Sequence, residues 1–229
     1  MMLLSLAPQA GADTPGAAAN DAAHCANPQT LDLMRLLPPP PTASAEQRVE
    51  LAQMLRIQAR RTPAEVARAR ADVQVSIFRF ADALGNPQGF TPERLPHLMQ
   101  LFRDLYTDEL AILDAKDRFA RPRPFTQEPR LSPVVDKPKS FSYPSGHSTW
   151  GTAAGLVLAD MVPERRVRIL RRAQEYAHNR IVGGVHYPSD VEAGRLAGTA
   201  LAAVLFDCPA FVSEEAEAKA ELRELLGLH

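Results

Sequence analysis

The chain has 229 residues, of which 45% are hydrophobic and 23% charged, and its formal net charge at pH 7 is −1. This length and composition suit one domain with a sizeable hydrophobic core. The balanced charge argues against a nucleic-acid-binding protein and against a polybasic membrane tether. The longest apolar run, residues 196–206, is interrupted by Gly198 and Thr199, and it falls short of the ~20 residues that span a bilayer.

Residues 1–30 form an alanine- and glycine-rich segment with a short apolar start and an Ala10-Gly11-Ala12 sequence of the kind found at cleavage sites. A secretory signal has a basic region followed by ~7–15 apolar residues, whereas this segment contains no lysine or arginine. Two interpretations therefore stay open for residues 1–30, a signal-peptide remnant and a plain N-terminal arm.

The chain has two cysteines, Cys25 and Cys208. In an oxidising compartment they would form one disulfide that joins the N-terminal segment to the last core helix. Two unrelated free thiols are the alternative that the cysteine count leaves open.

Two helices are expected after the proline run 38–41, which itself favours extended backbone. Residues 44–47 have a capping-box pattern, and the helix they begin should end near residue 61. Residues 62–65 repeat the pattern, with proline at the first helical position. Apolar residues at helical spacing extend this second helix to residue 84, where Gly85-Asn86-Pro87 predicts its end.

The second half of the chain is also predicted to be helical. A turn around residues 91–95 precedes a helix over 96–117, and a loop rich in proline, lysine and serine covers residues 125–141. Further helices are expected over residues 145–161, 164–182, 188–206 and 213–226. No stretch shows sustained strand alternation, so residues 31–229 are predicted to fold as one all-α, single-domain helical bundle.

The helix predicted at residue 145 opens with Ser145, Gly146 and His147. A helix start offers unpaired backbone N–H groups and a partial positive charge, which suit an anion. Glycine lets the backbone approach a ligand closely. The residues thus indicate a phosphate-binding turn beside a proton donor, and an ordinary capped helix with a surface histidine is the alternative.

Residues on both sides of this turn complete a three-part pattern. It consists of a lysine separated by six residues from Arg-Pro, a Pro-Ser-Gly-His turn, and an arginine separated by five residues from a histidine that is separated by three from an aspartate. The pieces are Lys116, Arg123-Pro124, residues 144–147, Arg180, His186 and Asp190. The chain thereby resembles the type 2 phosphatidic acid phosphatase and vanadium haloperoxidase superfamily, and is most similar to bacterial class A non-specific acid phosphatases. Asn179 stands where the family pattern has serine.

The chemistry of these residues agrees with the resemblance. Lys116, Arg123 and Arg180 supply positive charge for a phosphate dianion, with arginine suited to bind two oxygens at a time. A carboxylate such as Asp190 fixes the tautomer of a neighbouring histidine and stabilises positive charge on its ring.

The resemblance also implies a role for each residue. His186 would be the nucleophile, passing through a phosphohistidine, and Asp190 would orient it. His147 would be the general acid, and later the base that activates water. Ser145 and the N–H of Gly146 would bind phosphoryl oxygens.

The function implied is a metal-independent acid phosphatase, periplasmic and without a cofactor, that hydrolyses a small phosphomonoester and also transfers the phosphoryl group to alcohols. No Cys/His cluster has zinc spacing, and three cations would repel a divalent ion. The alternatives are a vanadate-dependent haloperoxidase and a non-catalytic oxyanion-binding helical protein. We expect three aromatic residues at the mouth of the pocket, Tyr143, Trp150 and Phe125. His178 is given no role in the site. The last helix and the proline run are candidate contact surfaces in a homo-oligomer.

Overall fold

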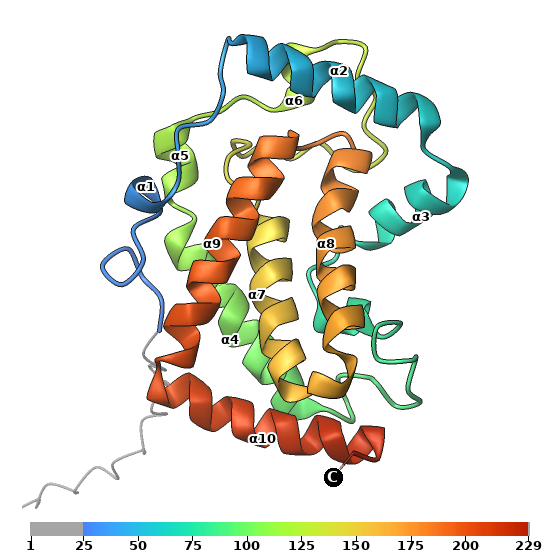
Figure 1. The fold of residues 1–229 in the computed structure, drawn as a ribbon, viewed down its shortest axis with the longest axis vertical. Helices are drawn as coiled ribbons and strands as arrows, with labels where there is room; N and C mark the ends of the chain where they lie inside the picture. The colour runs from blue at the N-terminus through green and yellow to red at the C-terminus, as the bar shows by residue number, and fades with distance from the viewer. Residues whose placement is uncertain (1–24, 229) are drawn as a thin grey trace, which may run out of the picture.

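The computed structural model describes residues 25–228, and within this range it contains helices and no strand (Figure 1). Residues 1–24, which hold most of the expected N-terminal arm or signal remnant, lie outside the described residues. The helices are α1 (Leu33–Leu36), α2 (Ala45–Arg60), α3 (Pro63–Ala71), η1 (Ile77–Phe80), α4 (Pro96–Ile112), α5 (Ala115–Phe119), α6 (Pro124–Gln127), α7 (Gly146–Met161), η2 (Pro163–Arg165), α8 (Arg166–Val182), α9 (Pro188–Phe206) and α10 (Pro209–Leu226). The predicted all-α class is confirmed.

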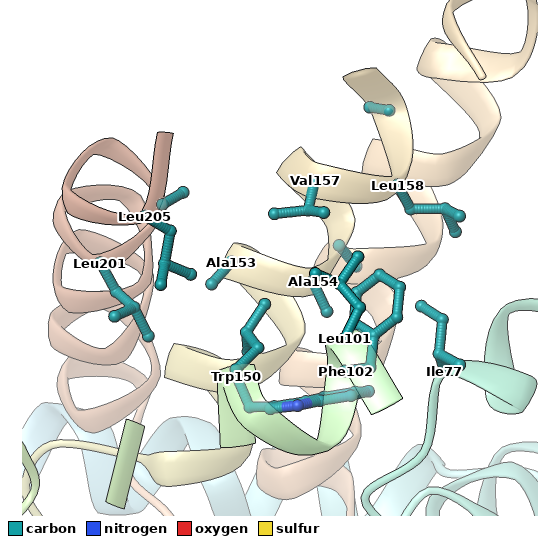
Figure 2. Packing of buried hydrophobic residues seen from close by; sticks show 14 of the residues in the cluster. Ile77, Leu101, Phe102, Trp150, Ala153, Ala154, Val157, Leu158, Leu201 and Leu205 are labelled. Carbon is teal, nitrogen blue, oxygen red and sulfur yellow. The ribbon is translucent and has the colours of Figure 1, made fainter. Parts of the chain in front are cut away.

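Helix α7 is the centre of the bundle. It lies between α8 and α9 and also contacts α4 (Figure 1). A helix with apolar or small residues on all sides belongs in a core, and most of α7 is buried. Figure 2 shows Trp150 of α7 near Phe102 of α4, with Leu201 and Leu205 of α9 beyond Ala153. Burying one side chain of the size of leucine or phenylalanine contributes about 1.5–3 kcal/mol to the free energy of unfolding.

Two glycines let α9 approach the backbone of α7. A Cβ at Gly194 would lie 2.5 Å from the carbonyl oxygen of Ser145, and one at Gly198 would lie 2.3 Å from that of Thr149. Residues four apart share one face of a helix, so both glycines face α7. The close crossing brings the start of α9 against the start of α7, where the N–H of Ser145 donates to the carbonyl oxygen of Asp190 at 3.0 Å.

The start of α7, the end of α8 and the start of α9 meet at one end of the bundle, and α2 lies across that end (Figure 1). Helix α2 is held there by Met54, which packs with Leu131, Ile181 and Tyr187. Helix α10 crosses the opposite end and packs against α4. The sulfurs of Cys25 and Cys208 are joined in the structure, with Cα atoms 5.9 Å apart, so the start of the described chain is tied to the α9–α10 junction.

The helix expected over residues 62–84 is much shorter than predicted. It ends at Ala71, and a 3₁₀ turn, η1, follows after an irregular segment. The cause is tertiary: the side chain of Asp72 is drawn to α8, where Arg172 and Asn179 donate to it at 2.6 and 2.7 Å. Apolar spacing along the chain does not reveal such a contact, and here it overrides the local preference for helix.

The other departures from prediction are smaller. The helix expected over 96–117 is divided into α4 and α5, and a short helix, α6, lies at the start of the predicted loop. Helix α10 begins at Pro209, earlier than expected, and proline at the first helical position was the signal available for it. Helix α1, which was not predicted, is capped by Asp32, whose side chain accepts from the N–H of Met34.

Within residues 25–228 no single helix has the length and apolar composition needed to cross a membrane. Helices α9 and α10 reach that length and composition only together, and the chain bends by 93° between them.

Candidate active site

The site is built around the contact of His186 with Asp190. The Nδ1 atom of His186 lies 3.2 Å from Oδ2 of Asp190, and its Nε2 atom lies 2.8 Å from Nη1 of Arg123. A guanidinium can only donate, so we assign Nε2 as the acceptor and place the ring proton on Nδ1, where it is donated to Asp190. The ring thus presents a lone pair at Nε2.

The surroundings of His186 favour this neutral form. Only 3% of the residue is exposed, and burial lowers its pKa well below the ordinary value. The positive charges of Arg123, Lys116 and Arg180 lower that pKa further. A neutral imidazole with one unprotonated nitrogen is the form in which histidine acts as a nucleophile or base, once that nitrogen is released by its hydrogen-bond donor.

Asp190 is held by more groups than the histidine. Besides His186, its Oδ2 atom accepts from the hydroxyl of Ser142 and, at 2.9 Å, from the N–H of Tyr187. Its Oδ1 atom accepts from Nη1 of Arg121 at 2.5 Å. The carboxylate is fully buried, and charge-assisted hydrogen bonds of this kind keep it in one orientation.

Arg121 is a residue of the site that the sequence motif did not identify. It is buried, its guanidinium lies 3.8 Å from the centre of the Tyr187 ring, and it donates to Glu50 of α2 at 2.8 Å as well as to Asp190. The available signal was the Arg121-Pro122-Arg123-Pro124 run. Proline keeps this segment extended, and side chains two apart in extended backbone point to the same side. Arg121 therefore reaches Asp190 while Arg123 reaches His186.

Three cationic side chains, of Lys116, Arg123 and Arg180, lie around His186. Lys116 donates to the carbonyl oxygen of Pro144 and, at 3.4 Å, to that of Phe141, and burial lowers its pKa to about 8. Arg123 donates to the carbonyl oxygens of Ser140 and Val185, and burial lowers its pKa to about 10. These positive charges repel one another, and an anion that binds among them would relieve the repulsion and would itself be stabilised.

Arg180 is the third cation. It is 3% exposed, and burial lowers its pKa. Its Nε and Nη1 atoms have no hydrogen-bond partner among the described residues. A buried N–H group without a partner costs free energy, and phosphoryl oxygens would supply acceptors for these N–H groups.

The start of α7 contributes His147 and backbone donors. Ser145 is the N-cap, and its hydroxyl accepts from the N–H of Ser148 at 3.4 Å. A Cβ at Gly146 would lie 3.0 Å from Oε1 of Glu109, so a larger residue would crowd this turn. The ring of His147 stacks on Tyr176 with centroids 5.9 Å apart. Burial, assisted by Arg180, lowers its pKa to about 3.

Comparison with known proteins relates the chain to one family. The sequence pattern of the PAP2 superfamily matches residues 100–213. The non-specific acid phosphatase of Providencia stuartii is 31% identical over 90% of this chain and 86% of its own. The chain belongs to the PAP2 superfamily. The non-specific acid phosphatase of Salmonella typhimurium is 33% identical over 68% of this chain and 66% of its own.

One solved structure supports the PAP2 fold. A bacterial vanadium-dependent iodoperoxidase matches with a TM-score of 0.59 and 20% identity. The match covers 77% of this chain, which spans about half, 54%, of the peroxidase chain. At this identity the likeness concerns the fold alone.

In this PAP2 chain the predicted motif residues gather at one end of the bundle. Two of the residues expected at the mouth of the pocket lie in the core instead. Tyr143 and Trp150 are each 1% exposed and belong to the hydrophobic core, so that expectation is wrong. The Tyr143 hydroxyl instead donates to the carbonyl oxygen of Pro38 at 2.6 Å. His178 is exposed and lines a separate cavity with arginines of α2.

The PAP2 site offers the donor set for an oxyanion, namely cations, backbone N–H groups and two histidines. Within residues 25–228 no group of three His, Cys, Asp or Glu side chains is placed to hold a metal ion.

Proposed function

We propose that the protein is an acid phosphatase that hydrolyses phosphate monoesters through a phosphohistidine at His186. The observation that carries the proposal is the Arg123–His186–Asp190 contact, which leaves Nε2 of His186 unprotonated among cations. Arg123 has to turn from Nε2 to a phosphoryl oxygen before Nε2 attacks phosphorus. Its relatives in the PAP2 superfamily, named as non-specific acid phosphatases, support the same activity.

In the first step the Nε2 lone pair forms a bond to phosphorus while the bond from phosphorus to the ester oxygen breaks. The leaving oxygen takes the electron pair and receives a proton from His147. The proton stays on Nδ1 of His186 and is donated in a hydrogen bond to Asp190, whose carboxylate stabilises the positive charge that builds on the ring. Lys116 and Arg180, with the N–H groups at the start of α7, hold the phosphoryl oxygens.

In the second step water attacks the phosphorus of the phosphohistidine. His147, now neutral, takes a proton from the water, and the electrons of the P–N bond return to Nε2 of His186. His147 then carries the proton that it held with the ester bound, and it loses this proton as inorganic phosphate leaves. An alcohol that takes the place of water would receive the phosphoryl group, which is the proposed phosphotransferase reaction.

The pKa of His147 determines whether the ring is protonated before or after the substrate binds. Burial and the neighbouring cations lower it to about 3, so the ring is neutral until a counter-charge arrives. A phosphate ester brings a charge of about −2 at neutral pH, which opposes Arg180 and raises the pKa of His147. The acid is thus protonated with substrate bound, and most readily at acid pH.

We also propose that the protein acts in the periplasm. The joined sulfurs of Cys25 and Cys208 support an oxidising compartment, where such a bond persists. Fractionation of native cells tests the location, and recovery of uncleaved protein with free thiols from the cytosol would overturn it.

Hydrolysis of p-nitrophenyl phosphate between about pH 4 and 8, in excess EDTA, tests the activity. We expect EDTA-resistant turnover that orthovanadate inhibits, and a His186→Ala variant that has lost it. His178→Ala changes an exposed histidine of the same helix bundle and is the matched control.

Rapid quenching with radiolabelled substrate should trap an acid-labile, base-stable phosphoprotein in the wild type. Turnover by His186→Ala near the wild-type rate would overturn the nucleophile assignment. No turnover at any pH would overturn the phosphatase proposal, and bromide oxidation by vanadate-loaded protein would then favour the haloperoxidase alternative over simple oxyanion binding.

A further inference from the structure

The segment 72–76, between α3 and η1, reaches the proposed acid. The carbonyl oxygen of Val73 lies 2.9 Å from Nε2 of His147. A carbonyl oxygen only accepts, so we assign the ring proton of neutral His147 to Nε2, which leaves the lone pair on Nδ1. If the hydrogen bond persists with substrate bound, Nδ1 is the nitrogen that gains and gives up the catalytic proton.

The Val73 carbonyl is held in place by polar contacts of its neighbours. Asp72 is fully buried; it accepts from Asn179 at 2.7 Å and from Arg172 at 2.6 Å. On the other side, the carbonyl oxygen of Gln74 accepts from the hydroxyl of Tyr176 at 3.0 Å. The side chain of Val73 itself is exposed, so apolar packing does not fix the segment.

The three donors form one stripe of α8. Arg172, Tyr176 and Asn179 stand at i, i+4 and i+7, the spacing of one helix face. Arg180 follows directly and enters the phosphate pocket. The same turn of α8 therefore sets the position of a phosphate-binding cation and of the segment that contacts His147.

Asn179 is the position at which this chain departs from the family pattern, which has serine. A serine hydroxyl is attached directly to Cβ, whereas the asparagine amide lies one carbon farther out. With the same backbone, serine would stop short of Asp72.

We propose that Asp72 and Asn179 are positioning residues for His147, because their contact holds the Val73 carbonyl that keeps the His147 proton on Nε2. The inference rests on the proposed role of His147 as general acid. The other groups that face His147 are Tyr176 and Arg180 of α8, Lys116 of α5 and, before α6, Arg123. They stay in place when residue 179 alone is changed.

The test is a comparison of leaving groups. p-Nitrophenol leaves as a stable anion and needs little help from an acid, whereas an alkyl alcohol needs a proton. We expect Asn179→Ser to lower kcat/KM for an alkyl phosphate by about tenfold or more, which is part of the 10²–10⁴-fold that general acid catalysis contributes, and to change kcat/KM for p-nitrophenyl phosphate much less. Gln174→Ser, on the exposed side of α8, is the matched control.

A paired exchange supplies a second, independent measurement. Asp72→Asn replaces the carboxylate that accepts from Asn179 and Arg172 with a neutral amide, which is a weaker acceptor, and should reproduce the selective loss. The double variant with Asp72→Asn and Asn179→Asp restores one donor and one acceptor and should recover part of the alkyl phosphate rate. Imidazole ¹⁵N chemical shifts report the tautomer directly: Nε2–H in the wild type, and a mixture in Asn179→Ser.

His147→Ala separates the two proposals. If this variant loses kcat/KM equally on both substrates, the acid assignment in the proposed function is wrong, because kcat/KM reports the step in which the ester bond breaks. If His147→Ala is selective but Asn179→Ser loses activity equally on both substrates, or keeps it on both with an unchanged tautomer, the positioning inference alone is overturned.

Discussion

A buried carboxyl beside the site makes a sharp prediction about stability. Glu109 of α4 is 1% exposed, and its Oε1 atom has no hydrogen-bond partner among the described residues. Burial raises its pKa from 4.5 to about 8, although the positive charge of Lys116 acts in the opposite direction. The folded protein therefore holds a proton that the unfolded chain has released across this pH range.

The linkage gives the sign and the size of the effect. Between the unfolded pKa and the folded pKa, each pH unit lowers the free energy of unfolding by about 1.4 kcal/mol, because the folded state binds more protons. From about pH 5 to pH 7 the contribution of Glu109 is a loss of roughly 2–3 kcal/mol. Glutamine keeps the shape of the protonated acid without titrating, so Glu109→Gln should remove this loss.

Urea unfolding at about pH 5 and pH 7 measures the difference between wild type and variant. We expect Glu109→Gln to unfold at a urea concentration that changes less with pH than in the wild type, and to be the more stable protein at pH 7. Glu224→Gln changes an exposed carboxyl on α10 and is the control. Equal pH dependence in wild type and Glu109→Gln would refute the argument.

Three further predictions concern groups around the site and the N-terminal tie. Arg121→Met should destabilise the fold by about 3–5 kcal/mol in urea unfolding, since it leaves the buried carboxylate of Asp190 without its cation; an unchanged midpoint would show that the pair contributes little. Because burial lowers the pKa of Lys116 to about 8, its positive charge is lost above that pH, so kcat/KM should fall there. Lys116→Arg should move that fall to higher pH, and an unmoved profile would assign it to another group. Thiol titration in denaturant should find Cys25 and Cys208 unreactive until reductant is added, and reduction should cost about 2–5 kcal/mol of stability.

Local signals in the sequence located most helix starts. Capping residues and first-turn prolines placed the starts of α2, α3 and α9, because these devices act through backbone groups a few residues away. Helix ends set by distant contacts were not predictable in this way. The end of α3 depends on donors about a hundred residues later in the chain, on α8.

The residues of the candidate site also fall into two groups, those that the sequence motif identified and those that only the structure revealed. The spacing motif identified Arg123, His186 and Asp190, and the structure brings these three into contact. It was silent on Arg121 and Glu50, whose contacts join α2 to the start of α9 across 69 to 139 residues of sequence. Positions that touch the reacting groups follow a motif, whereas the residues that hold them are chosen by the tertiary fold.

The two histidines are held by groups of different charge, and that difference supports the roles proposed for them. In the proposed mechanism His186 donates to the carboxylate of Asp190, which would stabilise a ring that becomes positive as it attacks phosphorus. His147 contacts a neutral backbone carbonyl, which orients the ring but offers far less stabilisation of positive charge. A protonated His147 therefore depends on the phosphate for its counter-charge and releases its proton readily as the ester bond breaks. Exchange of the two roles would leave the carboxylate beside the acid, where it would hold the proton that must be given away.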